Sequence, residues 1–134
     1  MTYRAYAGKW WAEIVNCHDA GTDGYAGVKG KPLSALAVEV SAGTVTYRAH
    51  QLADNRWLNA ITGYNTADSR NGYAGNKGKS IDALRINVQG AFGYTVQYRV
   101  SAVGEDWQAW CANGTVAGTV GKPIDRVQIT FVKA

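Results

Sequence analysis

This sequence is poor in the residues that cross-link or stiffen small proteins, and it has no long apolar segment. Its 134 residues include two cysteines, two prolines and one methionine, and charged side chains make up 18% of the total. No run of about 18 apolar residues occurs, which predicts that no segment inserts into a membrane. The N-terminus lacks a basic stretch followed by an apolar one, so we expect no signal peptide in this chain.

The two cysteines are not placed as a disulfide pair would be. Cys111 lies four residues after Trp107, and Ile14 and Ile61 follow earlier tryptophans at the same offset. A free cysteine behaves as a small hydrophobic residue, so we expect Cys111 to replace a buried aliphatic side chain. Cys17 has no equivalent cysteine in the other copies. The spacing therefore favours two thiols over a disulfide.

What the sequence has in abundance is glycine and aromatic residues. Sixteen glycines accompany eight tyrosines and five tryptophans, and 46% of the residues are hydrophobic. This composition is typical of a single globular domain of short strands joined by tight turns. The net charge of +4 suits a soluble surface, with attraction to an anionic polymer such as a cell wall as the alternative. No nucleic-acid motif is present, so we expect no nucleic-acid partner.

The whole chain consists of three copies of one pattern, at about residues 1–43, 44–93 and 94–134. Each copy has a Tyr-Arg strand, a Trp-led strand, an Ala-Gly-x-x-Gly-Lys turn and an alternating apolar strand. The Tyr-Arg strands contain Tyr3, Tyr47 and Tyr98, and the turns begin at Ala26, Ala74 and Ala117. Because the copies use the full length, no separate catalytic domain fits. Repetition on this scale favours repeated binding surfaces over a single reaction centre.

Alternation along the strands predicts which side chains face the core. The three tyrosines of the Tyr-Arg strands face inward, and the arginines beside them, Arg4, Arg48 and Arg99, face outward. The apolar strands expose one wet face and bury the residues Leu36, Val38, Val40, Leu84, Ile86, Val88, Val127, Ile129 and Phe131. The same rule places Trp10, Trp57 and Trp107 in the core. It leaves Trp11 and Trp110 on the opposite face, as exposed ligand contacts.

These strands predict an all-β, pseudo-threefold fold of three antiparallel meander sheets. Each meander joins the last strand of one copy to the first two of the next. The strand 2–7 then pairs with the strand 126–133, which closes the ring and removes two exposed edges. A β-prism-like arrangement of this kind is our expectation. The alternative is a β-trefoil, which needs a fourth strand near Tyr25, Tyr73 and Thr115.

The long polar loops carry most of the candidate ligand-binding residues, since loops on a rigid scaffold often carry function. In the second copy the candidates are Asp68, Arg70, Asn71 and Tyr73, with His50 pointing outward from the neighbouring strand. In the first copy they are Asp19, Asp23 and Tyr25, and Trp11 and Trp110 add exposed rings. Carboxylates, amides and guanidinium groups bind sugar hydroxyls, and aromatic rings stack on sugar faces. The alternative is that these segments are simply long turns, because Asp and Asn are turn residues.

Catalysis and metal binding find little support in the sequence. The histidines, His18 and His50, lie in different copies, and no carboxylate pair recurs. Asp19 and Asp23 lack the dense oxygen spacing of a calcium loop. We therefore expect no enzyme activity, no metal and no cofactor. A small hydrolase is the least favoured reading.

The second and third copies resemble the ChW repeat, the clostridial hydrophobic repeat. In the third copy the segments that carry the resemblance are 107–110, 116–122 and 124–129. In the second copy they are 47–57, 62–69 and 71–75, which are similar to a longer variant found beside lysozyme-like and amidase domains in cell-wall lytic enzymes of gut bacteria and their phages. The first copy departs from it, with Tyr6 in place of the histidine. The resemblance implies an attachment module that is extracellular or associated with the cell wall.

We therefore expect a non-catalytic carbohydrate-binding module, or lectin, that recognises a cell-wall or other surface glycan. Several weak sites on one rigid body would gain avidity on a polymer. The third copy lacks the long loop, so we expect it to bind weakly. The alternative is a protein-interaction or host-recognition module without glycan binding. The sequence leaves the oligomeric state open.

Overall fold

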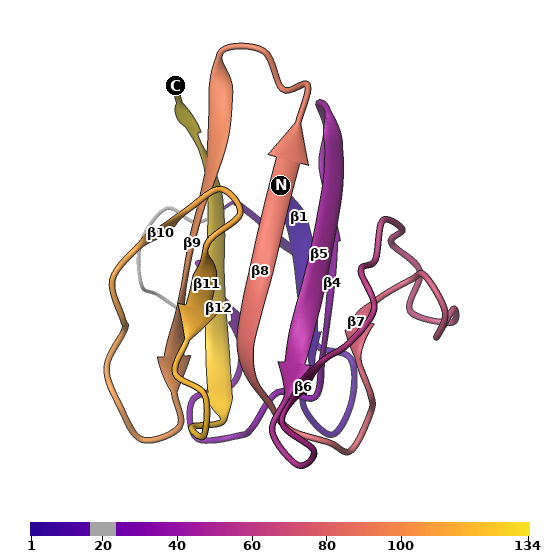
Figure 1. Ribbon diagram of the computed structural model, residues 1–134, viewed down its shortest axis with the longest axis vertical. Coiled ribbons are helices and arrows are strands. Elements are labelled where there is room, and N and C mark those ends of the chain that lie inside the picture. The colour runs from indigo at the N-terminus through magenta and orange to yellow at the C-terminus, as the bar shows by residue number, and fades with distance from the viewer. Residues whose placement is uncertain (17–23) are drawn as a thin grey trace.

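A computed structural model describes residues 1–16 and 24–134, which form an all-β fold (Figure 1). Twelve strands in these residues make three four-stranded antiparallel sheets. The predicted all-β, pseudo-threefold architecture of three antiparallel sheets is confirmed. Each repeat also contains the fourth strand, beside Tyr25, Tyr73 or Thr115, that the β-trefoil alternative required. Among the described residues, no helix is long and apolar enough to cross a membrane.

The three sheets follow one plan, and we name them by the repeat that supplies most of each. Sheet 1 contains, in spatial order, β2 (Ile14–Val15), β1 (Thr2–Tyr6), β4 (Ala35–Glu39) and β7 (Ala74–Gly75). Sheet 2 contains β6 (Arg56–Trp57), β5 (Thr44–Gln51), β8 (Ile81–Gln89) and β11 (Val116–Gly118). Sheet 3 contains β10 (Cys111–Ala112), β9 (Tyr94–Ala102), β12 (Ile124–Lys133) and β3 (Ala26–Gly27).

The fourth strand of every sheet comes from a different repeat. The second repeat gives β7 to sheet 1, the third gives β11 to sheet 2, and the first gives β3 to sheet 3. The exchanged strands are the Ala-Gly segments that the sequence predicted as turns. Because β3 pairs with β12, the first repeat is tied to the last and the ring closes.

This exchange corrects the predicted closure. The strand at the N-terminus, β1, pairs with β2 and β4, and β12 pairs with β9 and β3, so the two terminal strands do not pair with each other. The predicted meander across repeat boundaries is also wrong, because β4 pairs with β1 of its own repeat and β8 with β5. The two-residue strands β2 and β3 instead pair with part of the edges that the predicted pairing was meant to remove.

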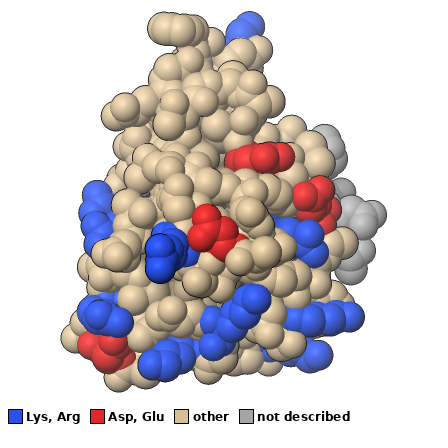
Figure 2. Space-filling view, turned by 90° about the vertical axis from the view of Figure 1, so that its right-hand side faces the viewer, with Lys and Arg blue, Asp and Glu red and all other residues tan. Residues whose placement is uncertain are grey.

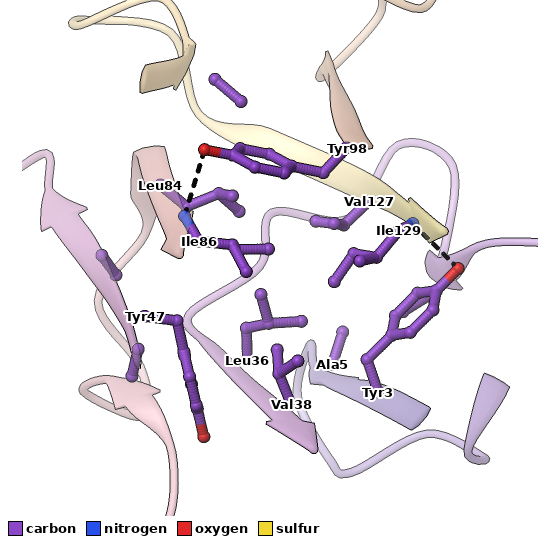
Figure 3. Packing of buried hydrophobic residues seen from close by; sticks show 14 of the residues in the cluster. Tyr3, Ala5, Leu36, Val38, Tyr47, Leu84, Ile86, Tyr98, Val127 and Ile129 are labelled. Carbon is purple, nitrogen blue, oxygen red and sulfur yellow. Dashed lines mark hydrogen bonds between the residues drawn. The ribbon is translucent and has the colours of Figure 1, made fainter. Parts of the chain in front are cut away.

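One core is shared by all three sheets, and its centre is built from the predicted inward faces (Figure 3). Tyr3, Tyr47 and Tyr98 are at most 2% exposed. The last strands contribute buried apolar side chains, among them Leu36, Val38, Leu84, Ile86, Val127 and Ile129. Full burial of such side chains contributes roughly 1.5–3 kcal/mol each, so this core is the main source of stability.

The core tyrosines connect neighbouring sheets through their hydroxyl groups. The backbone N–H of Ile129 donates to the Tyr3 hydroxyl at 3.1 Å, and that of Ile86 donates to the Tyr98 hydroxyl at 3.2 Å (Figure 3). Burial raises the pKa of Tyr47 to about 12, and a hydrogen bond with the Val38 backbone opposes that rise. Each tyrosine therefore bonds to the last strand of the preceding repeat.

The outer faces of sheets 1 and 3, opposite the shared core, are not the wet faces that alternation predicted. On β4, Ala35 and Ala37 are fully buried beneath Tyr73 and the half-buried rings of Tyr6 and Trp10. On β12, Gln128 is also fully buried. Sheets 1 and 3 are therefore covered on both faces at these positions, whereas Arg85 on β8 of sheet 2 is exposed, as alternation predicted.

The Ala-Gly-x-x-Gly-Lys turns gather at one end of the molecule. The turns lead into Leu33, Ile81 and Ile124; the Leu33 N–H donates to the Ile124 carbonyl at 2.8 Å, and the Ile81 N–H to the Leu33 carbonyl at 2.9 Å. Lysines precede each of these residues in the sequence. Figure 2 shows Lys and Arg gathered toward one end of the face it presents, while the opposite end is almost free of charge.

Replacing Tyr98 with Phe tests the inter-sheet hydroxyl bonds. The change leaves the buried N–H of Ile86 without its acceptor, and it removes the donor to the Thr115 carbonyl. We expect the free energy of unfolding to fall by about 1–3 kcal/mol. Urea denaturation measures it, with Tyr94→Phe as the control because Tyr94 is 54% exposed. Equal denaturation midpoints for the two variants would contradict the linking role of the hydroxyl.

Candidate ligand-binding site

The outer face of each sheet carries a tryptophan beside an arginine from the Tyr-Arg strand. The guanidinium carbon lies 4.9–5.8 Å from the indole centroid in the pairs Arg4–Trp10, Arg48–Trp57 and Arg99–Trp107. A cation held over an indole face is favourable by about 0.5–1 kcal/mol at an exposed site and more when desolvated. The arginines therefore face outward as predicted, and they order the rings.

The exchanged strands bring a further ring into two of these clusters. In sheet 1, Tyr73 packs edge-on against Trp10 with centroids 5.2 Å apart. In sheet 3, Tyr25 packs against Trp107 at 5.8 Å. Sheet 2 has the non-aromatic Val116 at the equivalent sequence position. The clusters of sheets 1 and 3 are thus built from two repeats each, and the cluster of sheet 2 differs from them.

One extra residue in each Trp strand, a β-bulge, explains why the tryptophans lie outside the core. Trp10 is bridged to Tyr6 while Ile14 pairs with Tyr3, so four residues on one strand span three on the other. A slip of one residue turns the side chains that follow to the other face. The same shift separates Trp57 from Ile61 and Trp107 from Cys111.

The prediction that Trp10, Trp57 and Trp107 are core residues was therefore wrong, and Trp11 is corrected in the opposite sense. Trp11 packs against the shared core, and its indole N–H donates to the Ala7 carbonyl at 3.1 Å. Trp110 is exposed, as expected, and Arg99 lies 4.6 Å from its ring centroid.

Beyond the bulge, the predicted inward positions are correct. Cys111 packs partly buried against the core, and burial raises the pKa of its thiol. It pairs with Tyr98 as Ile14 pairs with Tyr3. Cys17 lies outside the described residues.

His50 lies on the outer face of sheet 2, but it is covered rather than exposed. Its side chain forms a close pair with Asp82, with Nδ1 and Oδ1 2.6 Å apart, and it is only 4% exposed. The Trp57 ring packs edge-on over it, with centroids 5.2 Å apart. The expected outward-pointing histidine is therefore a buried support beneath Trp57.

The long loop of the second repeat is held in shape by two of its predicted binding residues. The Asp68 carboxylate accepts from the Arg70 and Asn71 backbone N–H groups at 2.9 and 3.3 Å. The Asn71 side chain accepts from the Thr62 N–H at 2.8 Å. Both residues are used as turn residues, which is the alternative that the sequence left open.

A pocket opens between β6 and this loop. Two of the predicted residues, Arg70 and Tyr73, line it, and His50 lies beneath its Trp57 ring. The rest of the lining includes Arg56, Asn59, Ser69 and Asn76. Arg70 and Asn59 are exposed, whereas Tyr73 is only 6% exposed. An indole thus stands beside amide, hydroxyl and guanidinium groups.

Sequence reasoning missed several members of this pocket. Trp57 was assigned to the core, and Asn59 and Asn76 were not singled out. The one sequence signal that Trp57 lies on the outer face was the recurrence, in every repeat, of an outward-facing arginine together with a tryptophan, here Arg48 and Trp57. Nothing in the spacing reveals that Asn76, from the exchanged turn, lies beside β6.

The first-repeat candidates are only partly described. Tyr25 lies on sheet 3, where the Arg126 guanidinium carbon lies 5.5 Å from its centroid and 4.7 Å from that of Trp107. Asp19 and Asp23 lie outside the described residues. Within residues 1–16 and 24–134, no group of three or more His, Cys, Asp or Glu side chains is arranged to hold a metal ion.

This chain matches no protein-family model, no curated protein and no solved structure. The resemblance to ChW repeats therefore rests on the sequence motifs alone.

A double-mutant cycle tests the buried pair beneath Trp57. His50→Ala leaves Asp82 Oδ1 buried without its partner, although Oδ2 keeps the Gly121 N–H, and Asp82→Ser removes the carboxylate from His50 Nδ1. Each single change therefore carries the cost of a buried polar atom left without its partner. We expect the two changes to be coupled by about 1–3 kcal/mol in the free energy of unfolding. The matched control is the exposed Lys122–Glu105 pair, for which we expect a coupling below about 0.5 kcal/mol. Additive effects at His50 and Asp82 would contradict the pairing.

Proposed function

We propose that this protein is a non-catalytic carbohydrate-binding module that recognises a cell-wall or other surface glycan. The observation that carries the proposal is the pocket beside β6, where Trp57 stands next to Asn59, Arg70 and Asn76. Flat apolar sugar faces stack on indole rings, and sugar hydroxyls exchange hydrogen bonds with amide and guanidinium groups. The pocket is partly open to solvent, which suits a segment of a chain more than an enclosed metabolite.

The pseudo-threefold scaffold supports binding to a polymer. Sheets 1 and 3 carry their own aromatic clusters with a cation, Lys77 over Trp10 and Arg126 over Trp107. Separate weak sites on a rigid body raise overall affinity for a repeating ligand, because the second contact forms at a high effective concentration. Action outside the cell, at a wall or surface, is part of this proposal.

Recognition of another protein is the second candidate, and one surface favours it. At the turn between β8 and β9, Phe92 is 95% exposed and Tyr94 is 54% exposed. Large exposed rings of this kind are enriched at protein interfaces. Binding by this turn in the absence of glycan would favour that function.

Two exposed residues of the pocket provide the test of glycan binding. Within the described residues, the side chains of Asn59 and Arg70 form no hydrogen bond or ion pair. The double variant Asn59→Ala with Arg70→Ala should therefore keep the melting temperature of the unmodified protein. We expect affinity for neutral oligosaccharide fragments of a wall or surface glycan to fall about tenfold or more, since each lost charged or neutral hydrogen bond contributes about 0.5–3 kcal/mol. Isothermal titration calorimetry measures the affinity.

The control for this pair is Lys133→Ala, which removes a charge from the exposed end of β12. Its affinity should match that of the unmodified protein. Trp57→Leu adds a test of stacking, and it should weaken binding while an aliphatic side chain keeps His50 covered. Unchanged affinity in the double variant, with the fold intact, would refute this pocket as the glycan site.

A further inference from the structure

Sheets 2 and 3 each have a buried carboxylate at a position where sheet 1 has none. The second residue of each last-strand segment is Asp82 in sheet 2 and Asp125 in sheet 3, and both are fully buried. Asp82 Oδ2 accepts from the Gly121 N–H at 2.8 Å, and Asp125 Oδ2 accepts from the Gly30 N–H at 2.8 Å. In each case the glycine belongs to the exchanged Gly-x-x-Gly-Lys turn, so the carboxylate anchors a turn from another repeat.

The turn of sheet 1 has the same backbone shape. The φ angles of Gly30, Gly78 and Gly121 are 90°, 88° and 99°. In all three turns the lysine N–H donates to the carbonyl three residues earlier at 3.0 Å. The Gly78 N–H therefore has the same orientation in its turn as the Gly30 and Gly121 N–H groups. It points toward the position that a carboxylate occupies in sheets 2 and 3.

Ser34 stands at that position in sheet 1, and its side chain is too short to replace the carboxylate. Across residues 1–16 and 24–134, no side chain accepts a hydrogen bond from the Gly78 N–H. Instead, the surface has a depression there, whose lining includes Tyr6, Ser34, Lys77, Gly78 and Ser80. No acidic side chain lines it. The depression thus offers donors where the sister sheets hold an acceptor.

Lys77 adds a positive charge and a link to aromatic rings at the same place. Its ammonium nitrogen lies 5.3 Å, 5.8 Å and 5.5 Å from the ring centroids of Tyr6, Trp10 and Tyr73. On this face the buried Arg4 Nε and Trp10 Nε1 also have no hydrogen-bond partner among the described residues. The outer face of sheet 1 therefore has an excess of donors and a ring surface beside them.

We propose that this depression binds the carboxylate of an acidic sugar. The ligand's carboxylate takes the place of the Asp82 and Asp125 carboxylates and accepts from the Gly78 N–H, with Lys77 supplying the counter-charge. The sugar ring lies over Tyr6, and the hydroxyl of Ser80 meets its hydroxyl groups. The choice of a sugar rests on the proposed function, whereas the carboxylate site rests on the comparison between the three sheets.

Titration of the ¹⁵N-labelled chain with glucuronate tests this site through the Gly78 amide resonance. Glucuronate should shift the Gly78 signal saturably, and glucose, which lacks the carboxylate, should leave it in place. Acetate and inorganic phosphate, which lack the ring, should bind at least about tenfold more weakly than glucuronate. Equal binding of glucose, or of acetate or phosphate, would overturn the assignment to an acidic sugar.

Ser34→Asp provides the sharpest variant, because it restores the internal carboxylate of the sister sheets. We expect it to fill the site and weaken glucuronate binding at least about tenfold, whereas Ser34→Ala leaves the site open and keeps binding within about threefold. The exposed Lys77→Gln should weaken binding several-fold without disturbing the core. Undiminished binding in both Ser34→Asp and Lys77→Gln would refute the site.

Failure here is distinguishable from failure of the proposed function. The test of glycan binding measures how substitution of Asn59 and Arg70 changes affinity for neutral fragments. The test of the acidic-sugar site measures the shift of the Gly78 amide resonance with glucuronate. A chain that binds neutral glycan but shows no Gly78 shift keeps the proposed function and loses this inference.

Discussion

A glycine in each repeat lets a strand approach its neighbour's sheet closely enough to complete it, and the ring of repeats depends on that approach. A Cβ at Gly27, Gly75 or Gly118 would lie 2.2–2.4 Å from a backbone oxygen of the adjoining last strand. All three have φ between 106° and 110°, which side chains disfavour. The contacts themselves are two or three residue pairs long. Their effect comes from geometry, because they hold three sheets around one core.

The parts of the fold that the sequence predicts are those that regular alternation controls. The inward tyrosines, the buried apolar last strands and the placement of Cys111 follow from period two, since each is required by the core. The exchange of β3, β7 and β11 does not follow, because a strand of two or three residues has no measurable period. The tryptophan faces were inverted for a related reason: a bulge of one residue leaves no mark in composition, yet it reverses every face beyond it.

The candidate site was predictable by region more than by residue. The second repeat was expected to carry the main site, and Arg70 and Tyr73 do line a pocket there. Asp68 and Asn71 instead bind their own loop, because short polar side chains satisfy nearby backbone N–H groups as readily as they bind ligands. His50 was placed on the correct face of its strand, but only Asp82, 32 positions away in the sequence, reveals that it is buried.

Near-symmetry of the backbone makes the differences between the sheets informative. Where all three repeats agree, as in the Arg–Trp pairs, the shared feature is explained by packing, because it orders the outer aromatic layer whatever the ligand. Where one repeat departs while its backbone stays the same, packing no longer explains the residue. Ser34 is such a departure, since the turn it faces keeps the shape that a carboxylate supports elsewhere. Val116, in place of Tyr25 and Tyr73, is another, and it leaves sheet 2 with a different outer cover. The chain therefore presents three unlike faces on one scaffold, which suits a polymer whose repeating unit contains more than one kind of group.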